Sequence, residues 1–161
     1  MRFRDPADWS VSVPARLQGI VEKRESLVVS CNRARDHVLI EATRRPLTPV
    51  LVALTVTDAR RLLAALRPQG RPIELPAVGS GLVGRHLVVT PTAQHVDLAI
   101  LGTAQPIGCW RILFDDVPQA GFALADSITL LRAENAAEHG PESGSPQASA
   151  IVATAGNGGR G

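Results

Sequence analysis

The chain has 161 residues, of which 45% are hydrophobic and 20% charged, and its formal net charge is +2 at pH 7. These values exclude a wholly disordered protein and favour one folded body that buries a single good core. The N-terminus is charged and leads into no apolar segment, and the longest uncharged apolar stretch, 46–57, is too short to span a bilayer. We therefore expect a cytoplasmic protein with no membrane partner.

Most of the segment 11–67 recurs, in altered form, within 73–132. Residues 27–30 (LVVS) correspond to 87–90 (LVVT) at an offset of 60, and residues 13–15 (VPA) correspond to 75–77 (LPA) at an offset of 62. This recurrence predicts an α+β fold built from an internally duplicated unit of four to five antiparallel strands followed by one helix, with the two units related by a pseudo-twofold axis. The expected parts are a polar lead-in at 1–8, repeat unit 1 at 9–68, repeat unit 2 at 69–133 packed with unit 1 as one domain, and a flexible tail at 134–161.

Within unit 1, alternation of apolar and polar residues predicts a strand over 9–13 that Pro14 closes. A short strand at 19–21, a charged turn at 23–25 and strands at 27–30, 37–42 and 50–56 follow, the last with apolar residues on both faces. Thr57 is the expected N-cap of a helix whose apolar stripe contains Leu62, Leu63 and Leu66. Pro68 and Gly70 should end this helix.

Unit 2 repeats the order, with strands expected at 73–75, 81–83, 86–90, 96–102 and 110–114. A second helix should begin at Asp116 and bury Val117, Leu124, Ile128 and Leu131 on one face. The offset of 60 matches residues 50, 52 and 54 to Trp110, Ile112 and Phe114, which predicts that these larger side chains belong to the core. We expect each sheet to be covered by its own helix and to leave exposed edges that invite self-association.

The residues 79–84 match the pattern GxGxxG of dinucleotide-binding loops. That use requires a helix to open inside the motif, whereas the residues that follow, 85–91, have the pattern of a strand. The glycines therefore predict a tight hairpin turn, and we expect no cofactor. Asp115 and Asp116 are adjacent carboxylates of the kind that bind metal ions, but Asp116 is explained as a helix cap and no further carboxylate cluster supports a site, so we also expect no metal.

Cys31 and Cys109 are the only cysteines and have no metal-ligand spacing, which favours two buried thiols. His37 and His95 each lie near an aspartate at the start of a strand, a pattern more typical of a surface hydrogen bond than of a general base. A nucleophilic pair of Cys31 or Cys109 with a histidine would make a small enzyme, which we rank last.

Positive charge is concentrated in the first half of the chain. Residues 1–85 carry 14 Lys and Arg against 8 Asp and Glu, a net charge of +6, whereas residues 86–161 carry 3 against 7, a net charge of −4. Such a division is typical of a protein whose first half meets an anionic partner, or whose two halves match each other. The candidate binding residues, for a partner or for phosphate, are Arg33, Arg35, Arg44, Arg45, Arg60 and Arg61.

We therefore predict a non-enzymatic binding or regulatory module that holds an acidic partner through this Arg-rich face and forms a homo-oligomer. The first alternative is a protein that binds single-stranded nucleic acid through the same face. Aromatic residues make up only 3% of the chain, and few would then remain exposed for stacking on bases.

The order of elements from Trp9 to Ala133, several strands and then a helix, twice, resembles that of the Whirly and PUR architectures and of the SsgA-like sporulation proteins of actinobacteria. The resemblance is one of topology. It implies two such units packed about a pseudo-twofold axis, frequent oligomerisation, and either single-stranded nucleic acid binding or the recruitment of protein partners.

Overall fold

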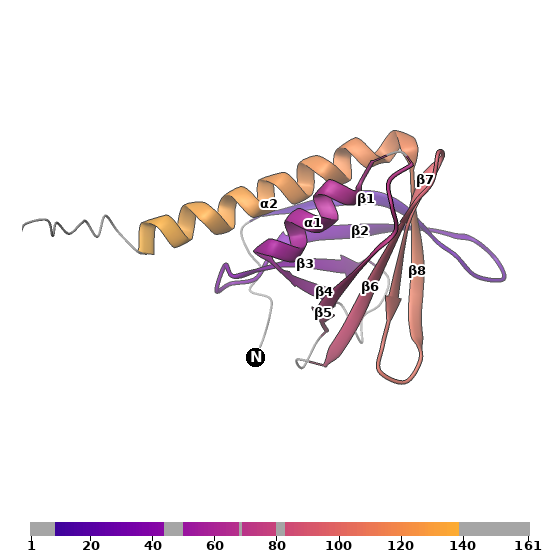
Figure 1. The fold of residues 1–161 in the computed structure, drawn as a ribbon, viewed down its shortest axis with the longest axis horizontal. Helices are drawn as coiled ribbons and strands as arrows, with labels where there is room; N and C mark the ends of the chain where they lie inside the picture. Colours follow the sequence, from indigo (N-terminus) through magenta and orange to yellow (C-terminus); the bar gives the residue numbers. More distant parts are fainter. Residues whose placement is uncertain (1–8, 44–49, 68, 80–82, 139–161) are drawn as a thin grey trace, which may run out of the picture.

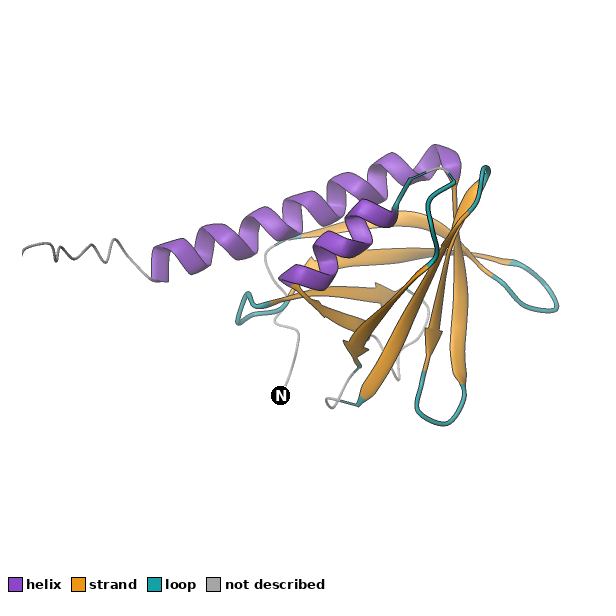
Figure 2. Ribbon diagram, viewed as in Figure 1, coloured by secondary structure: helices purple, strands orange, loops and turns teal. Residues whose placement is uncertain are grey.

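The computed structural model describes residues 9–43, 50–67, 69–79 and 83–138. Its elements are β1 (Ser10–Leu17), β2 (Lys23–Cys31), β3 (His37–Ala42), β4 (Val50–Thr55), α1 (Val56–Ala65), β5 (Ile73–Val78), β6 (Gly84–Pro91), β7 (His95–Leu101), β8 (Pro106–Leu113), a 3-10 turn (Phe114–Asp116) and α2 (Val117–Glu138). Each strand pairs antiparallel with the next one along the chain, and β8 pairs with β1 to close an eight-stranded barrel (Figures 1 and 2).

The two-residue period of the strands fills the interior of the barrel. Side chains alternate between the two faces of a strand, so one set of apolar residues points inward on every strand. Val13 of β1 lies opposite Leu27 of β2, and Leu75 of β5 lies opposite Leu87 of β6; all four are buried in one core. The strongest sequence signal, apolar periodicity, therefore marks the residues that hold the barrel together.

Both helices lie side by side over one side of the barrel (Figure 1). Helix α1 begins where the Thr55 hydroxyl accepts a hydrogen bond from the backbone N–H of Asp58, so the N-cap is Thr55 and not Thr57. The inward faces of both helices join the barrel core through residues such as Leu62, Leu124 and Ile128.

Apolar side chains from the helices and the barrel pack together beneath the helices. A cavity of about 20 Å³ remains between Leu62, Leu124 and barrel residues such as Val29 and Ile112. This volume holds one water molecule at most. An eight-stranded barrel can enclose a small ligand, but the interior of this one is occupied by its own side chains.

The α+β class is confirmed, but the expected pair of sheets, each under its own helix, is wrong. The strands form a single closed barrel, and both helices share one side of it. Closure pairs β1 with β8, which are about 100 residues apart in sequence. Closure therefore joins the sheet edges that we expected to be exposed, through short stretches of pairing.

Two local predictions near the start of the chain are also wrong. Residues 19–21 form the turn between β1 and β2, where Ile20 is 107% exposed, and residues 23–25 belong to β2. Isoleucine and valine favour strands, but Gly19 before them makes a turn, and the apolar pair lies at its tip.

Helix α2 also differs from the prediction at its end. It continues to Glu138, four residues past the expected start of the tail at residue 134, because residues 133–138 are rich in the good helix formers Ala and Glu. Phe114, assigned to the core from the sequence, is 47% exposed, whereas Trp110 is fully buried.

The β3/β4 and β7/β8 registers match as far as Ile40, where the β3/β4 register shifts, whereas the β7/β8 register shifts only after Ile100. Ile40 pairs with Val52, and the matching pair in the other half is Leu98 with Trp110. Val52 therefore corresponds to Trp110, at an offset of 58, and not to Ile112.

Candidate functional site: a charged row at the junction of β1 and β8

The barrel has two junctions at which pairing is short. In the described strands, β1 and β8 pair only at Arg16 with Arg111 and at Leu17 with Trp110. Helix α1 separates β4 from β5, and these strands pair only at Ala53 with Val78. We call these places the β1/β8 seam and the β4/β5 seam.

A proline accounts for the early end of pairing at each seam. The backbone N–H of Gln18 donates to the carbonyl of Cys109 over 2.9 Å, so even-numbered residues of β1 direct their backbone groups toward β8. Pro14 is one of these residues and has no N–H to donate. Pro76 occupies the corresponding position on β5, two residues before Val78. Proline is tolerated at such a strand edge and prevents the ladder from continuing across it.

Across the β1/β8 seam, four residues on neighbouring strands form an outward-facing row. Asp97 of β7 lies opposite Arg111 of β8, Arg111 opposite Arg16 of β1, and Arg16 opposite Arg24 of β2. We call these residues the charged row.

The same four positions at the β4/β5 seam carry no charge. Leu39 of β3 lies opposite Ala53, Ala53 opposite Val78, and Val78 opposite Gly84 of β6. We call these residues the uncharged row. Leu39 and Ala53 are buried there and pack with Val78 in a small apolar cluster separate from the main core. The fold thus closes one seam with uncharged residues at the positions where the other seam has three arginines and an aspartate.

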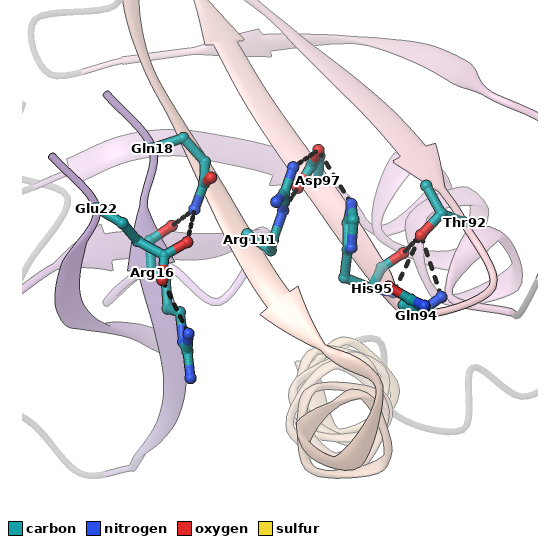
Figure 3. A network of polar contacts seen from close by, with 8 residues as sticks. All are labelled: Arg16, Gln18, Glu22, Thr92, Gln94, His95, Asp97 and Arg111. Carbon is teal, nitrogen blue, oxygen red and sulfur yellow. Dashed lines mark hydrogen bonds and ion pairs between the residues drawn. The ribbon is translucent and has the colours of Figure 1, made fainter. Parts of the chain in front are cut away.

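Hydrogen bonds fix part of the charged row (Figure 3). The Arg111 guanidinium donates to both Asp97 carboxylate oxygens, over 2.8 and 3.0 Å, and this hydrogen bond to Asp97 raises the pKa of Arg111. His95 Nε2 lies 3.5 Å from the same carboxylate. Such a two-point contact holds the guanidinium plane in one orientation.

Arg16 is held from the other side by the β1–β2 turn. Its guanidinium donates to Glu22 over 2.8 Å, and the Gln18 side-chain amide donates to the other Glu22 oxygen over 3.0 Å. The hydrogen bonds from Gln18 and then Arg16 lower the pKa of Glu22. Arg24 is exposed, and no hydrogen bond or ion pair to it occurs in the described part of the chain.

Beside the charged row the seam opens into a groove of about 260 Å³. Three arginines contribute to its wall together with two carboxylates, and the full lining is Pro14, Ala15, Arg16, Arg24, Glu25, Arg111, Leu113 and Asp116. Glu25 connects the groove to the core because its carboxylate accepts a hydrogen bond of 2.8 Å from the indole N–H of buried Trp110. Hydrogen-bond donors and acceptors therefore lie side by side in the groove.

Like charges meet across the β1/β8 seam, and neighbouring carboxylates offset part of them. Like charges directly opposite each other on neighbouring strands destabilise a sheet, and Arg16 faces an arginine on both sides. Glu22 and Asp97 compensate one guanidinium each.

The predicted Arg-rich face is described only in part. Arg33 and Arg35 lie in the β2–β3 turn, and Arg60 and Arg61 are exposed on α1. The pairing of His37 with Thr55 places the end of that turn beside the start of α1. Arg61 forms an ion pair with Asp58 over 3.1 Å.

The remaining pair, Arg44 and Arg45, lies outside the described residues. Thr43, which precedes them, bonds to Ser26 at the opposite end of β3 from the β2–β3 turn.

The glycine motif lies between two strands, as predicted for a hairpin. The Gly79 N–H donates to the Val83 carbonyl over 2.8 Å, residues 80–82 lie outside the described part, and β6 follows directly. The Arg85 guanidinium lies over Gly79, where a Cβ would push this flexible side chain aside.

The other candidate side chains occupy separate places. His37 contacts Asp36 over 2.7 Å, which confirms the predicted surface hydrogen bond. Cys31 and Cys109 are half-buried free thiols, and burial raises the pKa of both. Within the described ranges, no three His, Cys, Asp or Glu side chains come together in a group that could hold a metal ion.

Sequence reasoning did not nominate Arg16, Arg24 or Arg111. It looked for arginines that are neighbours in the chain, whereas these three are neighbours only across strands. An available signal was the two-residue period, which assigns Arg16 to the outward face of β1 between the inward residues Ala15 and Leu17.

Among the helices that the structure describes, none is both long and apolar enough to cross a membrane. No protein-family model matches the chain, and neither curated proteins nor solved structures match it.

Proposed function

We propose that the protein is a non-enzymatic binding module that holds an acidic segment of a protein partner in the groove beside the charged row. One observation carries the proposal: three arginines lie on neighbouring strands at positions that the same barrel fills with uncharged residues at its other seam. The counterparts Leu39 and Ala53 are buried, whereas Arg16, Arg24 and Arg111 remain accessible to a ligand, and this accessibility supports the proposal.

The chemistry of the groove favours a polypeptide. Carboxylates of the partner would be held by Arg24 and by the exposed edges of Arg16 and Arg111, as charge-assisted hydrogen bonds. Backbone N–H groups of the same segment would donate to Glu25 and Asp116, which also line the groove. The backbone of a single-stranded nucleic acid has no N–H groups to donate to these two carboxylates.

A second candidate, binding of single-stranded nucleic acid, is favoured by Phe114. This ring is half-exposed and lies in sequence between Leu113 and Asp116, both of which line the groove. Arginines beside an exposed aromatic ring suit base stacking. The test below therefore includes an oligonucleotide.

The test measures binding of the full chain to two fluorescent probes of equal charge, a glutamate-rich peptide and a single-stranded oligonucleotide, at low salt. The seam variant Arg16→Val/Arg24→Gly introduces the residues that occupy the same positions at the β4/β5 seam. We expect the wild-type protein to prefer the peptide. Loss of even one charge-assisted contact of roughly 1.5 kcal/mol weakens binding about tenfold, so the seam variant should bind the peptide at least about tenfold less tightly.

The matched control is Arg33→Ala/Arg60→Ala, which removes the same number of charges from the Arg-rich face. It should reduce affinity only through net charge, an effect that added salt removes. An equal loss of affinity in both variants would show a non-specific electrostatic effect. A loss of affinity in the control alone would show that the Arg-rich face is the binding site. Preference for the oligonucleotide would favour the second candidate, and no binding of either probe would end the proposal.

We also propose that the barrel arose by duplication of a unit of four strands and a helix. The correspondence of register supports this history. The single β4/β5 pair, Ala53 with Val78, falls at the positions that Arg111 and Arg16 hold at the β1/β8 seam, and each seam has its proline two residues before that pair. Expression of residues 9–68 alone provides a test: a self-complementary unit should assemble into a symmetric dimer, and an unfolded monomer would count against the proposal.

A further inference from the structure

We infer that the protein self-associates through the outward face of its two helices, with α1 of one copy lying on α2 of a second copy. The binding proposal concerns a different surface, the groove at the β1/β8 seam, so this inference does not depend on it. The inference begins with Phe122, which is 71% exposed on α2 although the chain has only three phenylalanines and no tyrosine.

Phe122 lies on a face of α2 that is turned away from the barrel. The inward face of this helix buries Ala120, Ala123 and Leu124, whereas Phe122 and Asp126, one turn apart, are exposed. Aromatic residues are enriched at the centres of protein interfaces, and charged residues lie more often at their rims.

The outward face of α1 has the opposite charge. Ala59 and Leu62 are buried, and Arg60, Arg61 and Ala64 are exposed. Arg61 is paired with Asp58, whereas neither Arg60 nor Asp126 has a hydrogen bond or ion pair among the residues that the structure describes. The helix layer thus presents two exposed strips, one with Arg60 and Arg61 on α1 and one with Phe122 and the single aspartate Asp126 on α2.

The two strips are aligned in a way that suits a second copy. The helices run antiparallel (Figure 1), and a Cβ built on Gly121 would lie 3.8 Å from the Leu63 side chain, so these two residues lie at the same level. From that level Asp126 is five residues along α2, about 7.5 Å, and Arg60 is three residues back along α1, about 4.5 Å in the same direction. An arginine side chain spans the remaining difference.

A twofold axis that runs parallel to the helices, between the two layers, brings each α1 over the other copy's α2 at an unchanged level. Phe122 then covers the region of Ala64 on the second copy, a small residue that leaves room for the ring, and Asp126 meets Arg60. Each contact occurs twice, as in any twofold interface. Charge complementarity therefore identifies a second copy of this chain as the occupant of the face.

The test is sedimentation equilibrium of the full chain over a wide range of concentration. We expect a monomer–dimer equilibrium for the wild-type protein and at least tenfold weaker association for Phe122→Ser, which changes an exposed side chain and should leave folding intact by circular dichroism. Val21→Ser, an equally exposed apolar residue at the β1–β2 turn, should dimerise like the wild type.

A charge exchange identifies the pairing. Arg60→Asp and Asp126→Arg should each weaken the dimer, and the double variant should restore its affinity to within about threefold of the wild type because the two charges are exchanged together. A wild-type monomer at every concentration would overturn the inference. So would a dimer that Phe122→Ser does not weaken, or a double variant that is weaker than both single ones.

Discussion

The charged row can be tested by exchanging residues between the two seams. Arg16→Val introduces the residue that occupies the corresponding position at the β4/β5 seam, and Ala53→Arg makes the reverse change at the position that corresponds to Arg111. If the fold does not need the charges, the first change should be tolerated and the second should not.

The structure sets the size of each effect. Arg16 faces Arg24 and Arg111, and each like-charge pair costs about 0.2–1 kcal/mol. The ion pair with Glu22 that is lost in the change is exposed to solvent and contributes little. Arg16→Val should therefore be neutral or stabilise the protein by about 1 kcal/mol.

The reverse change should be severe. Ala53 is 2% exposed and faces Leu39, so a guanidinium at position 53 would have no carboxylate where Arg111 has Asp97. An unpaired buried charge destabilises a protein by about 3–5 kcal/mol. Urea unfolding followed by circular dichroism measures both variants. If Arg16→Val lowers the free energy of unfolding by more than about 2 kcal/mol, the charged row stabilises the fold and the reasoning is refuted. If Ala53→Arg is tolerated, the β4/β5 seam does not require an uncharged residue.

Three further predictions concern packing, pH and thiol reactivity. Gly108→Ala should destabilise the barrel by about 1–3 kcal/mol in urea unfolding, because its Cβ would lie 2.7 Å from the buried ring of Trp110; an unchanged midpoint would contradict the packing described. For Asp36, desolvation is outweighed by hydrogen bonds from His37 and Asn32, so the pKa of its carboxyl is lowered. The ionised Asp36 should therefore stabilise the fold fully above its ordinary pKa of 3.8, and this contribution should be lost as the pH falls through the lowered pKa. Asp36→Asn, which lacks the titrating group, should show a shallower loss of stability on acidification. Burial raises the pKa of the Cys31 and Cys109 thiols, so both should react with iodoacetamide at pH 8 more slowly than glutathione does. A thiol that reacts faster than glutathione would support the hypothesis of a cysteine-dependent enzyme.

Local patterns in the sequence were sufficient for most of the elements. The apolar alternation at residues 37–42 and 96–102 predicted β3 and β7, and the leucines of 62–66 predicted a helix. These signals depend on neighbours within a few residues, which is the range over which side-chain period and capping act.

The closed barrel and the site could not be predicted in the same way because both depend on long-range pairing. The meeting of Arg16 with Arg111 joins residues at opposite ends of the barrel sequence, and no local period encodes it. The prolines gave a usable sign: Pro14 and Pro76 recur in matching segments, and a proline inside a strand indicates an edge. Read in that way, they mark the two seams.

The most direct test of the charged row as a binding site is a titration of the isotopically labelled full chain with the glutamate-rich peptide, followed by amide chemical shifts. The account predicts saturable shifts at Arg16, Arg24 and Arg111, with the amides of Leu39 and Ala53 unmoved. Shifts confined to Arg33 and Arg60, or to no residue at all, would contradict it.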